Sequence, residues 1–494
     1  MTANEGDARS EEQRVSGLNL DATKFPDAAT LKLDANLGRL QVSNIDGDID
    51  GDGDYDRLQA YGTRSFSIWD DQGKLVYNSG DQFEQIIARD FANIFNSEGT
   101  AADKDTRSDN KGPEPEGVAI GVINNRTYAF IGLERVGGVM VYEVTNPQKP
   151  QFVEYVPNQT GDLSPEGVAF IPASESPNGK NLLVVSHEVS NTVAVFEVNP
   201  PTRISDIQGA AHRSPLVGQT VQNVRGIITS LVTTGSGRGF YIQDPNPDSN
   251  NATSEAVFVF MGSSWTPPTG LAVGTSVQVA GRVDEFRPGN NANNLTITQI
   301  NGTVTGAAVN QIASLGTITP TVIGTGGRIP PNAVIQNDFT TTAGNVETGG
   351  DFDPVTEGID FYESLEGMFV QINNGVATSP TNSFGETWVL PDNGANATGR
   401  TARGGSLISA NDYNPERVQI DDDLFSSGTS PKVNVGATFN TITGVVSYNF
   451  NNYEVLPTSL AVASPGTLAK ETTTLAGDTN NLTIAAFNVE KLRP

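Results

Sequence analysis

Short runs of alternating apolar and polar residues, broken by glycine and proline turns, fill most of the chain, and within the first 200 residues this pattern repeats. The segment Pro115-Glu116-Gly117-Val118-Ala119 returns 50 residues later as Pro165-Glu166-Gly167-Val168-Ala169. Each copy continues into an apolar run, a glutamate (Glu134 or Glu188) and a strand that ends in Glu-Val. A period of this length with three or four short strands per unit is typical of a propeller blade, so residues 1–200 are predicted to form partial β-propeller blades.

The start of the chain carries a weaker trace of the same unit. Asn4-Glu5-Gly6-Asp7 resembles its glutamate-centred half, while the Pro-Glu-Gly half would precede Met1. Because two or three blades cannot close a ring, we expect the chain to be a fragment that begins inside a blade.

One amphipathic helix is predicted over residues 82–91, with an apolar face made of Phe83, Ile86, Ile87 and Phe91.

Beyond residue 200 the alternation predicts two further β regions. Five short strands in about 80 residues suit an OB-type barrel; they are Val224–Thr229, Gly239–Asp244, Ala256–Phe260, Gly274–Val283 and Leu295–Ile300. The predicted fold class is therefore all-β and multidomain, with partial propeller blades, an OB-like β-barrel and a second β domain. The expected boundaries are 1–200 for the blades, 201–307 for the barrel, 308–463 for the second β-rich domain and 464–494 for a linker with one last strand.

Composition and charge exclude several classes of function. The 494 residues contain no Cys, which rules out disulfides and thiolate sites, and only two His, which argues against a Ser-His-Asp triad or a His-rich zinc site. The net charge of −27 disfavours a polyanion binder, although residues 201–307 hold six Arg against six acidic residues. No apolar stretch is long enough to span a membrane, and the polar N-terminus shows no signal peptide. The cysteine-free, acidic composition suggests an exported bacterial protein, extracellular or at the cell surface.

The sequence NIDGDIDGDGDYDRL is the strongest local signal for a metal site. It fits the calcium-loop pattern D-x-D-x-D-G-x-x-D in two registers, which differ by two residues. The carboxylates involved are Asp46, Asp48, Asp50, Asp52, Asp54 and Asp56. Alternate carboxylates on a glycine turn can converge on one hard cation, so we predict a structural Ca²⁺ in a hairpin loop. The alternative is a solvated acidic turn.

Glutamates that recur with the blade period form a second candidate site. They are Glu114, Glu116, Glu134, Glu166 and Glu188. They could act as catalytic carboxylates or metal ligands, but the recurrence favours a structural role, in which they bind backbone N–H groups or arginines between blades. Arg64, on a predicted strand, is a candidate partner for one of them.

The near-neutral middle segment offers a candidate nucleic-acid interface. OB-type barrels bind single strands by stacking bases on aromatic side chains, with arginines on the backbone. The candidates are Arg225, Arg238, Tyr241, Trp265, Arg282 and Phe286. The alternative is that these are core aromatics and scattered surface arginines. Alternation assigns Phe240, Phe258 and Phe260 mostly to the core.

Several motifs resemble known families. DGDIDGDGDYD, GTRSFSIWD, SDNKGPEPEGVA and SPEGVAFIP resemble the last blades of the bacterial choice-of-anchor I propeller-like domain. ISDIQGAAHRSPLVGQTV and GFYIQDP resemble the OB-like domain of secreted, sugar-non-specific bacterial nucleases, and EGIDFYESLEGMFVQI and NDYNPERVQIDDD resemble the segment that follows it there. The closing LTIAAFNVEKL resembles the first strand of an endonuclease/exonuclease/phosphatase domain.

The resemblance implies a catalytic family whose active site this chain does not complete. Asn488 is the only family site residue that can be carried over, and the Mg²⁺ or Mn²⁺ site would belong to a catalytic domain beyond this chain. The leading hypothesis is therefore a non-catalytic portion of a secreted metal-dependent nuclease or phosphoesterase that binds single-stranded nucleic acid. The alternatives are an extracellular surface or interaction protein without a nucleic-acid role, and a propeller-based phosphatase- or phytase-like enzyme.

Overall fold

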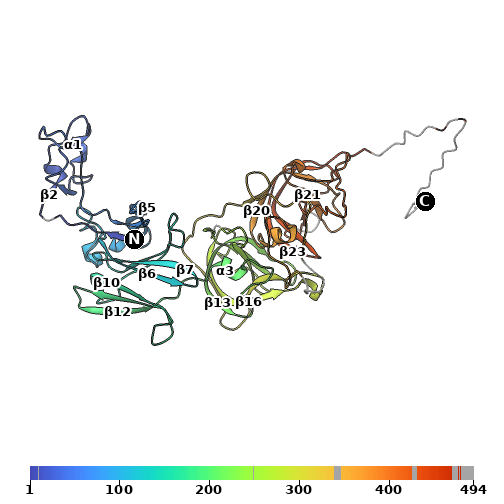
Figure 1. Cartoon of the computed structure of the whole chain (residues 1–494), viewed down its shortest axis with the longest axis horizontal. Coiled ribbons are helices and arrows are strands. Elements are labelled where there is room, and N and C mark those ends of the chain that lie inside the picture. The colour runs from blue at the N-terminus through green and yellow to red at the C-terminus, as the bar shows by residue number, and fades with distance from the viewer. Residues whose placement is uncertain are drawn as a thin grey trace. The chain divides into compact units, whose positions relative to one another are not determined.

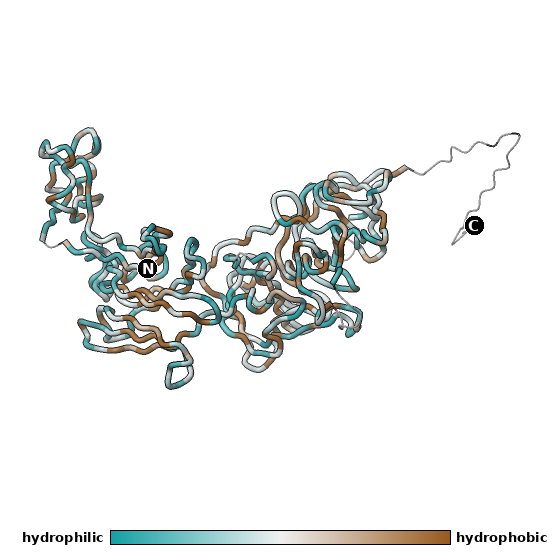
Figure 2. The backbone as a smooth tube through the Cα atoms, viewed as in Figure 1, coloured by the Kyte–Doolittle hydropathy of each residue, from teal (hydrophilic) through white to brown (hydrophobic). Residues whose placement is uncertain are grey.

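The computed structural model describes residues 1–469, apart from 9, 249, 339–345 and 426–430, together with residues 477 and 479. The chain divides into two compact units, Met1–Pro200 and Pro201–Pro494 (Figure 1). Strands dominate both units, so the predicted all-β, multidomain class is confirmed. Hydrophobic residues concentrate on the strands, as the brown stretches of Figure 2 show. In the described part of the chain, no helix has the length and hydrophobicity needed to cross a membrane.

The described residues of the first unit form four antiparallel sheets, of which three have three or four strands and the fourth is a two-stranded pair. The first contains β1 (Thr2–Asn4), β4 (Ser65–Trp69) and β5 (Leu75–Asn78). The second contains β6 (Pro115–Ile123), β7 (Arg126–Leu133), β8 (Val139–Glu143) and β9 (Gln151–Val156). The third contains β10 (Pro165–Ile171), β11 (Leu182–His187) and β12 (Thr192–Glu197). Such short meanders are the form that propeller blades take.

A small lobe with its own core lies between β1 and β4 in the sequence. It contains β2 (Glu12–Arg14), α1 (Ala28–Leu31) and β3 (Gln41–Ser43), and Val15, Leu18 and Val42 are buried within it. The predicted amphipathic helix is confirmed as α2 (Gln82–Asp90). Its Phe83, Ile86 and Ile87 are buried against Phe66 and Tyr142, because their spacing places them on one face.

The repeat predicted from the sequence is present in the backbone. Residues Glu114 and Ser164, which precede the two Pro-Glu-Gly copies, both have positive φ values, 50° and 58°. In each copy their carbonyl oxygens accept an equivalent hydrogen bond, from Glu134 N at 2.7 Å and from Glu188 N at 2.9 Å.

The two copies also pack against each other. A Cβ atom on Gly117 would lie 2.2 Å from the carbonyl oxygen of Glu166, so only glycine permits this approach. The rings of Phe130 and Phe170 stack at 5.6 Å.

The second unit begins with a closed five-stranded barrel that follows α3 (Ile204–Gln208). Its strands are β13 (Thr220–Val232), β14 (Gly239–Gln243), β15 (Ala256–Phe260), β16 (Ser276–Phe286) and β17 (Ile297–Asn301). The order β13-β14-β15-β17-β16 closes because β13 also pairs with β16. Each of the five strands predicted from the sequence coincides with one of these. β18 (Ala308–Gln311) pairs with β16, so this sheet extends past the expected boundary at residue 307.

The second barrel repeats this topology. It is preceded by β19 (Thr321–Ile323) and α4 (Gly358–Glu363), and its strands are β20 (Phe369–Ala377), β21 (Thr387–Leu390), β22 (Val418–Ile420), β23 (Thr438–Asn449) and β24 (Asn452–Ser464). The order is β20-β21-β22-β24-β23, closed by β20 and β23. In both barrels the third and fifth strands pair in parallel, β15 with β17 and β22 with β24. The OB-like arrangement expected once is therefore present twice.

Five short 3-10 segments complete the described elements. They are Val15–Gly17, Ala92–Ile94, Ala101–Asp103, Pro288–Asn290 and Asp392–Gly394.

Candidate functional sites

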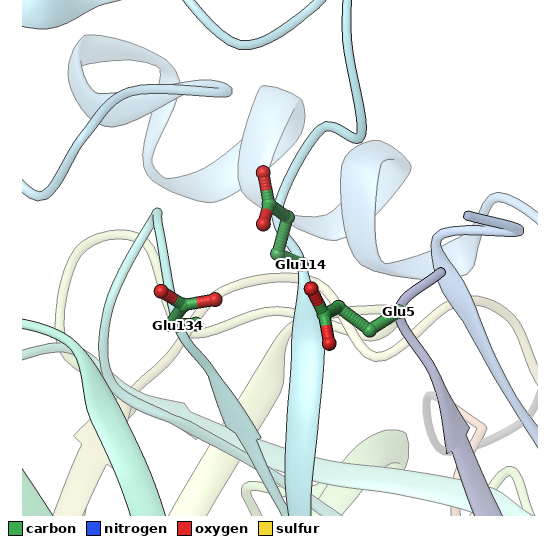
Figure 3. A group of neighbouring side chains, drawn as sticks. All are labelled: Glu5, Glu114 and Glu134. Carbon is green, nitrogen blue, oxygen red and sulfur yellow. The ribbon is translucent and has the colours of Figure 1, made fainter. Parts of the chain in front are cut away.

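Three glutamates from separate segments of the first unit bring their carboxylates together (Figure 3). Glu5 follows β1, Glu114 precedes β6 and Glu134 follows β7, and one oxygen of each lies within 4.8 Å of the others. The Glu114 side chain is fully buried. Glu134 is its neighbour through the hydrogen bond from Glu134 N to the carbonyl oxygen of Glu114.

Cationic side chains form ion pairs with the carboxylates of this cluster. Arg107 and Lys111 form ion pairs with Glu114, and Lys111 also reaches Glu5 at 2.6 Å. Arg135 pairs with Glu134 at 2.9 Å and lies 3.5 Å from Glu114. Burial by itself would raise the pKa of Glu114, but hydrogen bonds from Lys111 and Arg107 outweigh it, and the pKa is lowered.

The geometry of the cluster agrees with the structural interpretation of the recurring glutamates. An ion-pair network of this kind links the ends of several strands, and its carboxylate oxygens are paired with cationic side chains of the same unit.

The other glutamates of the repeat lie outside this network. Burial and the neighbouring carboxylates, of which Glu134 has the largest effect, raise the pKa of Glu116 to about 7. Glu166 and Glu188 are exposed. Arg64 was expected to pair with one of these glutamates. It instead forms an ion pair at 2.7 Å with Glu84, which lies on α2.

The aspartate-rich loop gathers part of the predicted calcium set. Oxygens of Asp48, Asp50 and Asp56 lie within 4.8 Å of one another, and these three residues belong to the second of the two registers. Asp48 also accepts hydrogen bonds from the backbone N–H groups of Gly51 and Gly53, at 2.7 and 3.0 Å. Both glycines have positive φ, which lets the chain fold back on itself.

The other aspartates of this loop serve its local structure. Asp46 accepts a hydrogen bond from the hydroxyl of Ser43 at 3.2 Å. Asp52 accepts from the backbone N–H of Asp54 at 3.1 Å, and burial together with Asp52 raises the pKa of Asp54. Asp48, Asp50 and Asp56 are therefore the residues that could hold a metal. Calcium binding by these three residues remains a prediction.

The candidate stacking platform Tyr241 is buried between the two barrels. Its side chain is 5% exposed, its ring lies 4.9 Å from that of Phe258, and its hydroxyl donates to Ser447 Oγ at 3.3 Å. Val445 and Leu456 of the second barrel cover the same surface. Tyr241 is thus unavailable for base stacking in this structure, because the β14–β15 face is closed by β23 and β24.

The remaining aromatic candidates are divided. Trp265 is half-buried against the barrel core, 5.7 Å from the ring of Phe240, whereas Phe286 is 48% exposed. Phe240 is buried as expected, but Phe258 and Phe260 are not in the core of their barrel. The core side of β15 carries Val257 and Val259, so the alternation on this strand has the opposite phase to the expectation.

The candidate arginines contact groups of the protein. Arg282 forms an ion pair with Asp284 at 2.6 Å, and Arg225 donates to Gln278 at 3.3 Å. Arg238 donates to the carbonyl oxygens of Gly235 and Trp265, at 3.1 and 3.4 Å. Contact with a phosphate would compete with each of these interactions. Asn488 lies outside the described residues.

A buried polar cluster joins the two barrels, and no pattern in the sequence pointed to it. His212 contacts Asp360 at 2.7 Å and Glu363 at 3.3 Å, and Tyr453 donates to Glu363. Burial opposes protonation of His212, but the two carboxylates outweigh it and raise its pKa to about 9. Glu366 accepts a hydrogen bond from Thr298 N at 3.0 Å. These residues fix the barrel–barrel contact.

Comparison with known proteins identifies the class of the first unit. Residues 1–147 match the family described as "Choice-of-anchor I domain", and residues 322–465, which contain the second barrel, match a "Domain of unknown function (DUF8508)". Gigasin-3a of Magallana gigas is 30% identical over 191 residues, which cover 34% of this chain and 67% of that protein. The chain therefore belongs to the same family as Gigasin-3a.

Two further similarities are more limited. The "Mesenchyme-specific cell surface glycoprotein" of Strongylocentrotus purpuratus is 30% identical over 133 residues, which cover 25% of this chain and 16% of that protein. The chain thus spans only a small part of that relative. The solved C-terminal domain of Pseudomonas aeruginosa PilY1 matches at 14% identity, over 82% of this chain and 91% of that one, with a TM-score of 0.14 that does not bear on the fold.

Proposed function

We propose that this chain is an interaction protein, secreted or at the cell surface, whose second unit is a two-barrel scaffold without a nucleic-acid role. The choice-of-anchor I match and the cell-surface glycoprotein relative support the location. The observation that carries the proposal is the closed β14–β15 face. In OB barrels the face of the second and third strands binds oligonucleotides, and here Tyr241 on that face packs against Val445 and Leu456.

Electrostatics supports the same proposal. The whole chain has a net charge of −27, so a polyanion would be repelled as it approaches. Arg282, an exposed arginine of the first barrel, is already neutralised by Asp284. Binding of an uncharged partner or of a basic protein carries no such penalty.

The test is fluorescence anisotropy of a labelled oligothymidine titrated with the full chain at low and at moderate salt. We expect no saturable binding. The proposal would be overturned by saturable binding that weakens as the salt concentration rises. Such binding should also be weaker in Arg238→Ala and unchanged in the exposed control Thr303→Ala.

The second candidate is the substrate-binding part of a secreted nuclease or phosphoesterase. The strand order of the first barrel and its balance of six Arg and six acidic residues favour it. A single strand would then contact Arg238 and Trp265, outside the covered face. The same titration separates the two candidates, because this one requires salt-sensitive binding.

Calcium at the aspartate-rich loop forms a separate part of the proposal. Three carboxylates within 4.8 Å repel one another in the absence of a cation. A hard cation that takes oxygen ligands would relieve this repulsion and order the lobe. Asp48, Asp50 and Asp56 would hold it, and its role would be structural.

A further inference from the structure

The third sheet of the first unit ends in an open edge strand. Its order is β10-β11-β12, so among the described residues β12 has a neighbouring strand on one side only (Figure 1). The second sheet has one strand more, because β9 pairs with β8. The sequences VMVYEV (139–144) and VAVFEV (193–198) make β12 the counterpart of β8 in the repeat. The place that β9 takes beside β8 is therefore free beside β12.

Three residues of β12 direct their backbone groups to this open edge. The N–H of Val198 donates to the carbonyl oxygen of Asn181 at 2.8 Å, and the pairing of β11 with β12 runs without a register shift. In an antiparallel pair only every second residue is hydrogen-bonded to the neighbouring strand. Val193, Val195 and Glu197 lie between the bonded positions, so their N–H and C=O groups point away from β11.

The edge also lacks the features that protect exposed strands. Natural edge strands are blunted by lysine, proline, bulges or short length. β12 has six residues, and its sequence TVAVFE contains neither proline nor lysine. Val193 and Val195 are 65% and 59% exposed, so β-branched apolar side chains lie beside the free backbone groups. By contrast, β9 is flanked by Pro150 and Pro157, and its pairing with β8 includes a register shift.

Acidic side chains lie at both ends of β12. Asp162 accepts a hydrogen bond from the hydroxyl of Thr192 at 2.6 Å, and the half-exposed Glu197 pairs with Lys180 at 3.2 Å. The net charge of −27 adds to these carboxylates and repels an acidic ligand, including a second copy of the chain. A basic segment meets no such repulsion.

We propose that β12 binds an extended, basic segment of another protein by strand addition, antiparallel to β12 as β9 is to β8. Main-chain hydrogen bonds to Val193, Val195 and Glu197 hold the segment, and its side chains cover the two valines. This inference rests on the proposed interaction function and names the surface and the chemistry of the partner.

The test uses a fluorescent peptide that copies residues 149–157, the region of β9, with Glu154→Lys to make it basic. In β9 this residue lies opposite Val141, the counterpart of Val195, and the apolar stem of a lysine can cover a valine there. We expect saturable binding to the full chain in fluorescence anisotropy. The unaltered peptide, which keeps Glu154, should bind several-fold more weakly because the acidic chain repels it.

Two variants of β12 locate the binding. Val195→Pro removes an N–H that faces the open edge, and Val193→Lys places a like charge beside the peptide, so each should weaken binding by about tenfold or more. Val189→Lys is the matched control, because Val189 is 57% exposed in the turn before β12, and it should leave binding unchanged. The peptide should also slow hydrogen–deuterium exchange of residues 193–197. Val193→Lys keeps the experiment decisive if Val195→Pro does not fold.

Three outcomes would overturn the proposal. The first is the absence of saturable binding of the basic peptide. The second is binding that neither variant weakens or that leaves exchange in β12 unchanged. The third is a dimer of the full chain that Val195→Pro dissociates, which would assign the edge to a second copy. Failure of the proposed function would instead appear in the oligonucleotide titration, so the two failures are distinguishable.

Discussion

The hydroxyl of Tyr241, on the second strand of the first barrel, donates a hydrogen bond to Ser447 Oγ, on the fourth strand of the second barrel, at 3.3 Å. This contact closes the face that OB barrels use for oligonucleotides. A side chain that sequence reasoning assigned to base stacking thus holds two domains together. The second barrel repeats the topology of the first and covers that face with residues of β23 and β24.

Replacement of Glu114 by Gln should destabilise the first unit strongly. Arg107, Lys111 and Arg135 would lose the buried negative charge that they share, and breaking a buried ion pair costs about 3–5 kcal/mol. Glu98→Gln is the matched control, because Glu98 is half exposed, pairs with the same Arg107, and should change stability by about 0–1 kcal/mol. Urea unfolding at pH 7 measures both, and equal effects would contradict the structural role of Glu114.

The same variant has a defined pH dependence. The pKa of Glu114 is lowered in the folded state, so its contribution is present above the unfolded value of about 4.5 and is lost as the pH falls below it. The stability difference between the wild type and Glu114→Gln should therefore shrink under acid conditions.

Glu116→Gln should stabilise the first unit at pH 8 and have little effect at pH 4. The folded pKa of Glu116 is raised to about 7, so the folded state keeps its proton where the unfolded state has lost it. Stability then falls as the pH rises from about 4.5 to 7, and the variant removes this loss. Thermal unfolding at both pH values measures the effect, with Glu166→Gln, the exposed counterpart in the repeat, as the control for net charge. An equal gain at both pH values would be inconsistent with a raised pKa.

Calcium should raise the melting temperature of the protein, and a chelator should reverse the increase. A ligand that binds only the folded state stabilises it by about 2.7 kcal/mol at one hundred times its Kd. Asp48→Asn and Asp56→Asn should abolish the response, whereas Asp46→Asn, whose carboxylate contacts Ser43, should retain it. A melting curve that calcium leaves unchanged would show that the loop holds no calcium. Loss of the response in Asp46→Asn but not in Asp56→Asn would favour the other register.

Gly117→Ala should cost more stability than Gly167→Ala, although the two positions are equivalent in the repeat. The new Cβ at position 117 would meet the backbone oxygen of Glu166 at 2.2 Å, whereas at position 167 it would meet the Ser186 hydroxyl, which can rotate away. Overpacking of this kind costs about 1–3 kcal/mol. Urea unfolding of both variants measures the difference, and equal values would argue against the close stacking of β6 on β10.

The sequence alone predicts those features that depend on local pattern. The Pro-Glu-Gly repeat, the helix ending at Asp90 and the five strands of the first barrel depend on alternation and turn residues, which act over a few positions. A local pattern does not predict what covers an outward-facing side chain, because that depends on which domain packs against it. Tyr241 and Ser447 are 206 positions apart, and His212 and Asp360 are 148 apart, so no local signal joins them.

Similar reasons apply to the candidate sites. The glutamates of the repeat were identified by their period, but their cationic partners Arg107 and Lys111 come from an irregular segment without a pattern. The aspartate loop fits two calcium registers in the sequence, and only the fold of its glycine turns brings Asp48, Asp50 and Asp56 together.

Hydroxyl-radical footprinting of the full chain tests most directly whether the β14–β15 face is closed. Tyr241 is 5% exposed and Tyr413, in the same unit, is 50% exposed, so the two tyrosines form a pair with the same intrinsic reactivity. Tyr241 should be oxidised several-fold more slowly than Tyr413 in the native protein and at the same rate after denaturation. Equal oxidation of the two in the native protein would contradict the account, because the face would then be open to a nucleic-acid strand.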